Sequence, residues 1–177
     1  MRKGGVVMGR EVIIIVDMLK GFLEKGHPLY CGSESRAIIP NVVSLLKDKR
    51  DAEIIYVCDN HEENDREFKM FPKHCVKGSV ESEIIDELKP FKGAIIPKTR
   101  YSGFYNTSLE DILKKINPDK VTVVGVCTDI CVMHTVADLR NRDYSVEVPV
   151  SCVASLDDDN HRFALKHMEK VLGAKLV

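Results

Sequence analysis

The sequence lacks long apolar runs and lacks an excess of charge of either sign. No apolar run among the 177 residues approaches the roughly 18 that cross a bilayer, and none precedes the charged pair Arg10-Glu11. We therefore expect neither a membrane span nor a signal peptide. The 26 basic and 27 acidic residues leave a formal net charge of -1, which gives no general attraction to nucleic acid or to an anionic membrane. These absences favour a soluble cytoplasmic protein.

Repeats, low-complexity segments and linkers are missing as well, which predicts one domain. A chain of 177 residues is long enough to bury one full-sized core. We expect a single domain over residues 1–177, in which residues 1–9 are a flexible extension and Met8 is an alternative start. Because no export signal is seen, the six cysteines are expected to be free thiols rather than a disulfide framework.

Short β-branched runs alternate with helical patterns along the chain. Four runs are nearly continuous, as in strands covered on both faces, whereas a fifth alternates and is expected nearer an edge. The predicted strands are 12–16, 54–57, 94–96, 121–124, 144–150 and 174–177. The predicted helices are 36–50, 80–88, 108–116 with Ser108 as its N-cap, 129–141, and 159–172 with Gly173 as its stop. This alternation predicts a parallel sheet with helices on both faces.

Three chemically active side chains follow predicted strands. Asp17 follows the first strand, Lys98 the third, and Cys131 lies in the turn from the fourth strand into a helix. Because parallel sheets place their chemistry beyond the carboxyl ends of the strands, we expect the three to meet there. A helix N-terminus and an ammonium favour a thiolate, a carboxylate can carry its proton, and amides of the turn 125–131 can form an oxyanion hole. The set predicts acyl transfer through a thioester.

Each of these residues also has an ordinary structural interpretation. A strand-terminal aspartate is often only a cap or turn former, and a strand-terminal lysine is often solvated. Cys127 is the alternative nucleophile or a redox partner of Cys131, although the spacing differs from that of thioredoxin-type motifs. His134 could act as a base, but a helical histidine is more often hydrogen-bonded structure. His161 and Asn160 are expected to cap or tie down the last helix, or to meet a partner subunit.

The second predicted strand runs into Asp59-Asn60-His61, and His74 follows within an irregular segment, residues 60–79. Aspartate and histidine are good ligands for zinc, iron or manganese. Irregular segments of this length in a compact domain are usually functional or disordered. The alternative is an ordinary charged loop, because many ionisable residues surround these three. The neighbours are Glu62, Glu63, Asp65, Arg66 and Lys69.

The motif Gly125-Val-Cys-Thr-Asp-Ile-Cys131-Val, together with Asp17 and Lys98, resembles the isochorismatase-like cysteine hydrolases over essentially the whole chain. The pattern Asp59-x-His61 with Phe71-Pro72-x-His74-Cys-Val-x-Gly-Ser79 is similar to nicotinamidases, which convert nicotinamide to nicotinate and ammonia. The resemblance implies a six-stranded, mostly parallel sheet in a Rossmann-like three-layer α/β/α fold. It also implies that Asp17, Lys98 and Cys131 form a catalytic triad.

The resemblance further implies one divalent metal ion that holds the pyridine ring nitrogen, with zinc expected and iron or manganese as alternatives. The implied metal ligands are Asp59, His61 and His74, with Glu67 as a fourth. The implied substrate-binding residues are Phe22 and Tyr101, which match aromatic positions that sandwich the ring, and Val126. The implied cis peptide bond is Val126–Cys127, and the implied oxyanion donors are the amides of Cys127 and Cys131.

We therefore predict a nicotinamidase in NAD salvage that acts through a thioester on Cys131. A second hypothesis keeps the triad, needs no metal, and changes the substrate to another small amide such as a carbamoyl or ureido compound. A third hypothesis is a non-catalytic metal- or thiol-binding module with the same fold. The expected partners are a small-molecule amide and further copies of the chain in a dimer or tetramer, with neither nucleic acid nor membrane.

Overall fold

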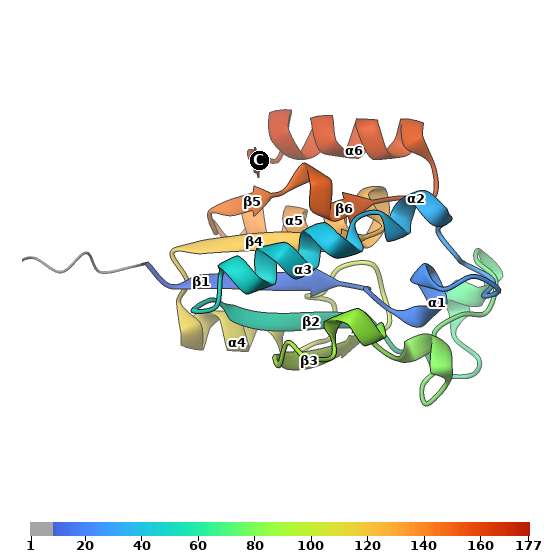
Figure 1. Cartoon of the computed structure of the whole chain (residues 1–177). Helices are drawn as coiled ribbons and strands as arrows, with labels where there is room; N and C mark the ends of the chain where they lie inside the picture. Colours follow the sequence, from blue (N-terminus) through green and yellow to red (C-terminus); the bar gives the residue numbers. More distant parts are fainter. Residues whose placement is uncertain (1–8) are drawn as a thin grey trace, which may run out of the picture.

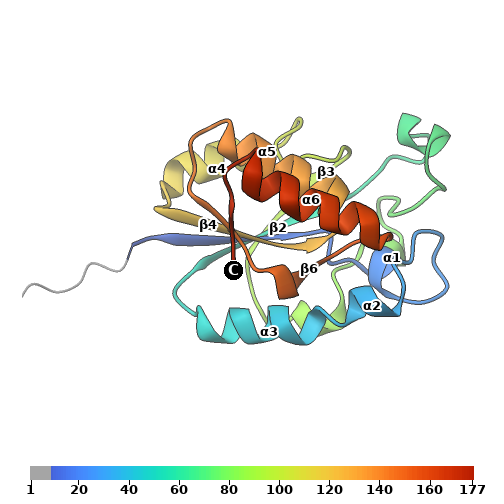
Figure 2. The same cartoon turned by 90° about the horizontal axis from the view of Figure 1, so that it is seen from above.

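One parallel sheet lies between two layers of helices (Figures 1 and 2). The computed structural model describes residues 9–177. The strand order is β3-β2-β1-β4-β5-β7, and the short β6 pairs with β4 further along that strand than β5 does. The strands are β1 (Glu11–Val16), β2 (Glu53–Asp59), β3 (Ala94–Lys98), β4 (Lys120–Val126), β5 (Val146–Val148), β6 (Val153–Ala154) and β7 (Lys175–Leu176).

Helices cover both faces of this sheet. Figure 2 shows α2 and α3 on one side and α4, α5 and α6 on the other, while α1 lies past the carboxyl ends of the strands in Figure 1. The helices are α1 (Lys20–Leu23), α2 (Ser33–Arg36), α3 (Ile39–Asp48), α4 (Leu109–Ile116), α5 (Met133–Arg140) and α6 (Asp158–Lys170). None of the helices within residues 9–177 has the length and apolar character of a membrane span.

The central strand β1 explains why the apolar runs are nearly continuous. Its side chains alternate between two cores, so Ile13 packs on the side of α3 and Ile14 packs on the side of α4 and α5. Both residues are fully buried. A strand covered on both faces has no position for a polar side chain until it ends, which is where Asp17 stands. The predicted α/β fold with a mostly parallel sheet is confirmed.

Two expectations about the strands need correction. The sheet has a seventh strand, the two-residue β6, in a segment that carries too short an apolar run to be recognised. The run in β3 does not lie between two covering layers, because β3 is an edge strand and Ile95 is 63% exposed. Pro97 fits this edge, since a proline cannot donate to a further strand.

The predicted helix 80–88 is wrong. The segment contains two 3-10 turns, η2 (Val80–Ser82) and η3 (Asp86–Leu88), separated by extended backbone. Ile84 forms an antiparallel bridge with Leu19, and the N–H of Lys20 donates to the carbonyl of Glu83 at 2.9 Å. Backbone groups of this segment therefore form hydrogen bonds with the chain just after β1, in place of the hydrogen bonds that they would form within a helix.

Three helix boundaries also differ from expectation. The predicted helix 36–50 is divided into α2 and α3, and Pro40 lies in the first turn of α3. Ser108 makes no side-chain cap to α4, because the hydroxyl of Thr107 accepts from the N–H of Leu109 instead. The predicted helix 129–141 begins with a π-helical turn, η4 (Thr128–Val132), before α5. The predicted flexible extension, residues 1–9 with Met8, lies outside the described residues except for Gly9.

Gly125 provides a stability test at the end of β4. Its φ of +118° is unfavourable for other residues, and a Cβ there would overlap the carbonyl oxygen of Val16. We expect Gly125→Ala to lower the free energy of unfolding by at least about 2 kcal/mol more than Gly26→Ala does. The reason is that overlap of the new Cβ with the backbone adds to the cost of a positive φ. Gly26 is the matched control, since its φ is +103° and no atom lies within 4 Å of an added Cβ. Urea unfolding measures both values, and equal losses would contradict the close approach of β1 and β4.

Candidate active site

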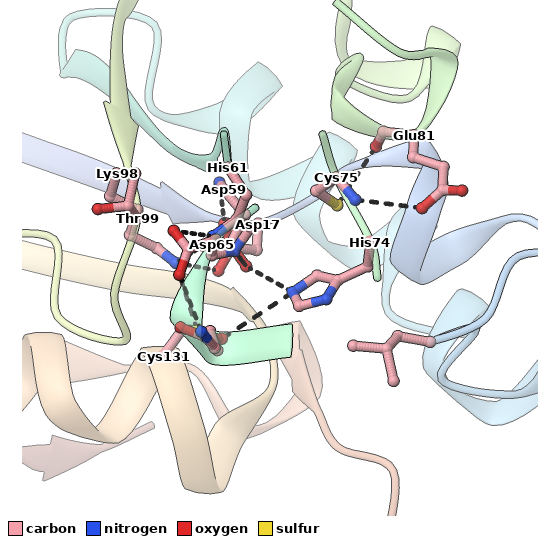
Figure 3. Close-up of polar contacts among 12 residues, drawn as sticks. Asp17, Asp59, His61, Asp65, His74, Cys75, Glu81, Lys98, Thr99 and Cys131 are labelled. Carbon is pink, nitrogen blue, oxygen red and sulfur yellow. Dashed lines mark hydrogen bonds and ion pairs between the residues drawn. The ribbon is translucent and has the colours of Figure 1, made fainter. Parts of the chain in front are cut away.

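The carboxyl ends of four strands bring the predicted catalytic and metal-binding residues together. In the register of β2 and β3, Asp59 is directly opposite Lys98. In the registers of β1, Val16 is opposite both Val57 and Gly125, so Asp17 emerges between the ends of β2 and β4. Figure 3 shows these side chains converging with Cys131, His61 and His74.

Lys98 lies at the centre of this cluster and is completely buried. Its Nζ is 2.9 Å from Oδ2 of Asp17 and 3.4 Å from Sγ of Cys131, and it donates a short hydrogen bond to Oδ1 of Asp59. Oxygen atoms of Asp17 and Asp59 and the sulfur of Cys131 all lie within 4.8 Å of one another. This set of two carboxylates and a thiol already surrounds an ammonium group, so we do not regard it as a metal site.

The backbone holds Asp17 in a defined position. Its φ is +49°, and its N–H donates to the carbonyl of Val57 at 2.9 Å. Its Oδ1 accepts from the N–H of Asp59 at 2.7 Å, so its Oδ2 is the oxygen that faces Lys98. Residues held in sparsely populated conformations cluster at functional sites, which agrees with the position of Asp17 in the cavity.

Burial and charge shift the pKa values in opposite directions. Burial, together with the nearby negative charge of Asp59, raises the pKa of Asp17 to about 6. Burial alone would lower the pKa of Lys98, but Asp17 and Asp59 outweigh it and hold that pKa well above its usual value. Burial raises the pKa of Cys131 despite the opposing effect of Lys98. The expected thiolate is therefore not the resting form, and the thiol must pass its proton to another group in order to react.

Cys131 lies in the turn η4, which is held in place by a contact from α6. Within η4, the hydroxyl of Thr128 lies 2.8 Å from Nδ1 of His161, which is the expected tie to the last helix. The peptide bond Val126–Cys127 is cis, as the resemblance implied. His134 is exposed, and its Nδ1 donates to the carbonyl of Ile130 at 2.7 Å, an ordinary helix contact.

Cys127 makes a different contact from Cys131. Its sulfur lies 3.5 Å from the sulfur of Cys31 and has no contact with Asp17 or Lys98 among the hydrogen bonds and ion pairs of residues 9–177. The hydrogen bond with Cys31, followed by burial, raises the pKa of Cys127 well above its usual value. All six cysteines are free, as expected. Cys131 is therefore the better nucleophile candidate, and Cys127 belongs to the pocket wall.

A second cluster, which we call the metal cluster, comprises Asp59, His61 and His74. One ligand atom from each lies within 4.8 Å of the others. Nε2 of His61 and Nε2 of His74 are each 3.6 Å from Oδ2 of Asp59. Two backbone hydrogen bonds hold the segments together, because the N–H of His61 donates to the carbonyl of Cys75 and the N–H of Lys77 donates to the carbonyl of His61.

The hydrogen bonds around the metal cluster fit a divalent cation. Nδ1 of His61 lies 3.1 Å from Oδ2 of Asp65, and Nδ1 of His74 lies 2.8 Å from the carbonyl of Pro72. Because a carboxylate and a carbonyl can only accept, each Nδ1 carries a proton, and Nε2 of each ring in its neutral form presents a lone pair. Such second contacts are typical of histidine metal ligands. Nε2 of His61 is buried and has no hydrogen-bond partner within the described chain.

Glu67 faces the same cluster from the 3-10 turn η1 (Arg66–Lys69). Its Oε1 lies 4.0 Å from Nε2 of His74, and its buried Oε2 has no hydrogen-bond partner among residues 9–177. Burial, with the charge of Asp59 beside it, raises the pKa of Glu67. Glu67 does not belong to the group whose ligand atoms all lie within 4.8 Å of one another, so it remains a candidate fourth ligand.

Asp17 and Cys131 of the triad and Asp59 and His74 of the metal cluster line one small cavity. Phe22 and Tyr101 both line it, as expected for residues that contact a ring, whereas Val126 is fully buried and is not part of its wall. The remaining lining residues include Leu29, Phe71, Ile130 and the half-exposed Leu156. Phe71 and Ile130 belong to the motifs that carried the family resemblance, whereas sequence reasoning missed Leu29 and Leu156, because isolated apolar residues in loops carry no signal of their own.

A larger and more open groove lies over one face of β2 and β3. Its walls include Tyr56, Phe91, Lys92 and Ile95, and it contains no residue of the triad or of the metal cluster. Size alone therefore does not identify the active site here. The small cavity is the candidate because buried ionisable groups converge in it.

Residues 11–176 match the Isochorismatase domain family. The chain belongs to the isochorismatase family of hydrolases. An uncharacterised family protein, PncA of Bacillus subtilis, is 31% identical over 94% of this chain and 98% of its own length. A probable inactive nicotinamidase of Arabidopsis thaliana is 27% identical over 90% and 88% of the two chains.

Solved structures of relatives with different substrates share the fold. A pyrazinamidase/nicotinamidase from Streptococcus mutans is 33% identical, with a TM-score of 0.87 and coverage of 94% and 99% of the two chains. An N-carbamoylsarcosine amidase from Thermoplasma acidophilum is 31% identical, with a TM-score of 0.85 and coverage of 94% and 95%. A pyrazinamidase of Pyrococcus horikoshii in complex with zinc is 29% identical, with a TM-score of 0.86 and coverage of 95% and 98%.

Lys98 gives a test of the buried charge network. Lys98→Met leaves Asp17 and Asp59 without their shared cation, so we expect the free energy of unfolding to fall by about 3–5 kcal/mol. Lys120→Met is the matched control, because Lys120 also joins two carboxylates, Glu11 and Glu147, but does so at the surface. That control is expected to lose about 1 kcal/mol or less. Urea unfolding at neutral pH measures both, and similar small losses would contradict the network.

Proposed function

We propose that this isochorismatase-family hydrolase is a nicotinamidase, which releases ammonia from nicotinamide through a thioester on Cys131, in NAD salvage. The observation that carries the proposal is the convergence of a buried Asp17–Lys98–Cys131 set and an Asp59–His61–His74 cluster in one small cavity. A triad alone suits any small amide. A metal cluster beside it adds a fixed point for a ring nitrogen, and the aromatic walls suit a flat ring.

In the proposed reaction Asp17 accepts the thiol proton of Cys131 as the sulfur attacks the carboxamide carbon. The raised pKa of Asp17, about 6, lets the same group return the proton to the leaving ammonia near neutral pH. Lys98 stays charged and balances the negative charge as it moves between sulfur and carboxylate. The amides of Cys127 and Cys131 are the proposed donors to the oxyanion.

Thioester hydrolysis uses the same residues, with water as the attacking group and the sulfur of Cys131 as the leaving group. Asp17 takes a proton from the attacking water, and the thiolate of Cys131 regains its proton when nicotinate leaves. The zinc ion that Asp59, His61 and His74 would hold supplies a Lewis acid for the ring nitrogen. Phe22 and Tyr101 would confine the ring between them, so that its carboxamide faces the sulfur.

A second candidate function is hydrolysis of another small amide without a metal. The observation that favours it is the N-carbamoylsarcosine amidase structure, which is as similar in fold and nearly as similar in sequence as the nicotinamidase structure. Ureidoacrylate amidohydrolases are also similar to part of the chain, at 39% identity over 69 residues. The metal cluster separates the two functions, because this second function gives the histidines no task.

Loss of the nucleophile tests the mechanism. We expect Cys131→Ala to lower the rate of ammonia release from nicotinamide on the order of 10³-fold or more, because the thioester can no longer form. Cys152→Ala is the control, since Cys152 is a buried thiol outside the cavity. Rapid denaturation of the wild-type reaction followed by mass spectrometry should find a nicotinoyl adduct on the peptide that contains Cys131. Turnover by Cys131→Ala at the wild-type rate would refute the mechanism.

Metal removal and a substrate panel separate the two candidate functions. After dialysis against a chelator, nicotinamide hydrolysis should fall at least about tenfold and should return on addition of zinc, because the ring loses its anchor. The panel is nicotinamide, benzamide, ureidoacrylate and N-carbamoylsarcosine, and benzamide is the matched control because it keeps the carboxamide but has no ring nitrogen. Hydrolysis of a ureido or carbamoyl compound by metal-free protein, without turnover of nicotinamide, would favour the second function.

A further inference from the structure

We propose that Asp65 is a positioning residue for the metal cluster, and that one carboxylate holds both His61 and the loop that carries Glu67. This inference rests on the metal site of the proposed function but not on the identity of the substrate. Asp65 belongs to the charged segment between His61 and His74, in which Glu62 and Glu63 face solvent. The side chain of Asp65 is only 7% exposed, whereas that of Glu63 is 67% exposed.

The first contact of Asp65 orients His61. Its Oδ2 accepts from Nδ1 of His61 at 3.1 Å, and the His61 side chain is completely buried. A carboxylate that accepts from Nδ1 fixes the tautomer of the neutral imidazole and the plane of the ring, so that Nε2 is the nitrogen that faces the metal cluster. That nitrogen is one of the buried atoms without a hydrogen-bond partner among residues 9–177, and it lies 3.6 Å from Oδ2 of Asp59.

The second contact of Asp65 orders the loop. Its Oδ1 accepts from the N–H of Glu67 at 2.9 Å, so Asp65 is the N-cap of the 3-10 turn η1. An N-cap satisfies a backbone donor that the short turn cannot satisfy itself. Because the capped residue is Glu67, the cap places this carboxylate beside Nε2 of His74. The two oxygens of Asp65 thus act on two different members of the site.

A third contact compensates the buried charge and ties the loop to the sheet. Nη1 of Arg100 lies 2.9 Å from Oδ1 and 3.1 Å from Oδ2 of Asp65. Arg100 follows Lys98 by two residues just beyond β3, so the same strand end supports the triad and the metal cluster. A buried carboxylate without such a partner would be costly. Asp65 is therefore a fixed link between the sheet and His61.

The test compares zinc affinity among purified variants. We expect Asp65→Ala to weaken zinc binding by about 10–100-fold, which is the usual effect of removing the hydrogen-bond partner that orients a metal-binding histidine. Asp65→Asn keeps one acceptor oxygen and should lose less. Glu63→Ala is the matched control, because it removes one negative charge from the same loop at an exposed position. Competition with a chromophoric chelator gives the affinities, and the visible spectrum of the cobalt(II)-substituted proteins reports the ligand geometry.

The outcomes are distinct from those of the substrate assay. A zinc affinity for Asp65→Ala and Asp65→Asn within about twofold of wild type would overturn the proposal, since second contacts normally count for more. If Asp65→Ala does not fold, Asp65→Asn decides alone: weaker zinc binding and an altered cobalt spectrum support the proposal, and wild-type values overturn it. Failure of wild-type protein to bind zinc would overturn the metal site and this inference together. If the wild-type protein binds zinc but does not hydrolyse nicotinamide, the proposed substrate is wrong and the role of Asp65 is unaffected.

Discussion

The buried ammonium of Lys98 is the interaction on which the rest of the site depends. It lies between Asp17 and Asp59, and these two carboxylates could not both remain charged in a buried site without it. It also contacts the sulfur of Cys131, so the charge that appears on sulfur or on Asp17 during a reaction stays within reach of one cation. Asp59 connects this group to the metal cluster, because its second oxygen faces His61 and His74.

The parallel sheet explains how such an expensive group of charges is assembled. Asp17 and Asp59 stand at the carboxyl ends of buried strands and Lys98 at the carboxyl end of the edge strand β3, and the strand registers bring the three together. A strand end is the first place where an apolar run between two helical layers can admit a charge. The hydrophobic core that stabilises β1, β2 and β4 therefore also offsets the cost of holding ionisable groups without water around them.

The same physical reasoning shows what the sequence could reveal. Apolar runs predicted the strands because burial on both faces leaves little choice of residue, and strand ends predicted that Asp17 and Lys98 would meet. The segment 80–88 misled because its apolar spacing is helical, while its backbone is paired with the chain after β1. Asp65 could not be distinguished from its exposed acidic neighbours, since only the folded loop shows which carboxylate turns inward. The contact of Cys31 with Cys127 likewise depends on how the loop after α1 folds back.

Fold similarity cannot choose the substrate of this chain. A nicotinamidase at 33% identity and a TM-score of 0.87 and an N-carbamoylsarcosine amidase at 31% and 0.85 share the fold of this chain. What separates the two proposed reactions is the segment from His61 to His74, which lies outside the sheet and supplies two of the three residues of the metal cluster. The sheet accounts for how an amide bond could be attacked, and this segment for which amide could be held there. In the proposed function, the chemistry and the specificity therefore come from different parts of the chain, joined through the side chain of Asp59.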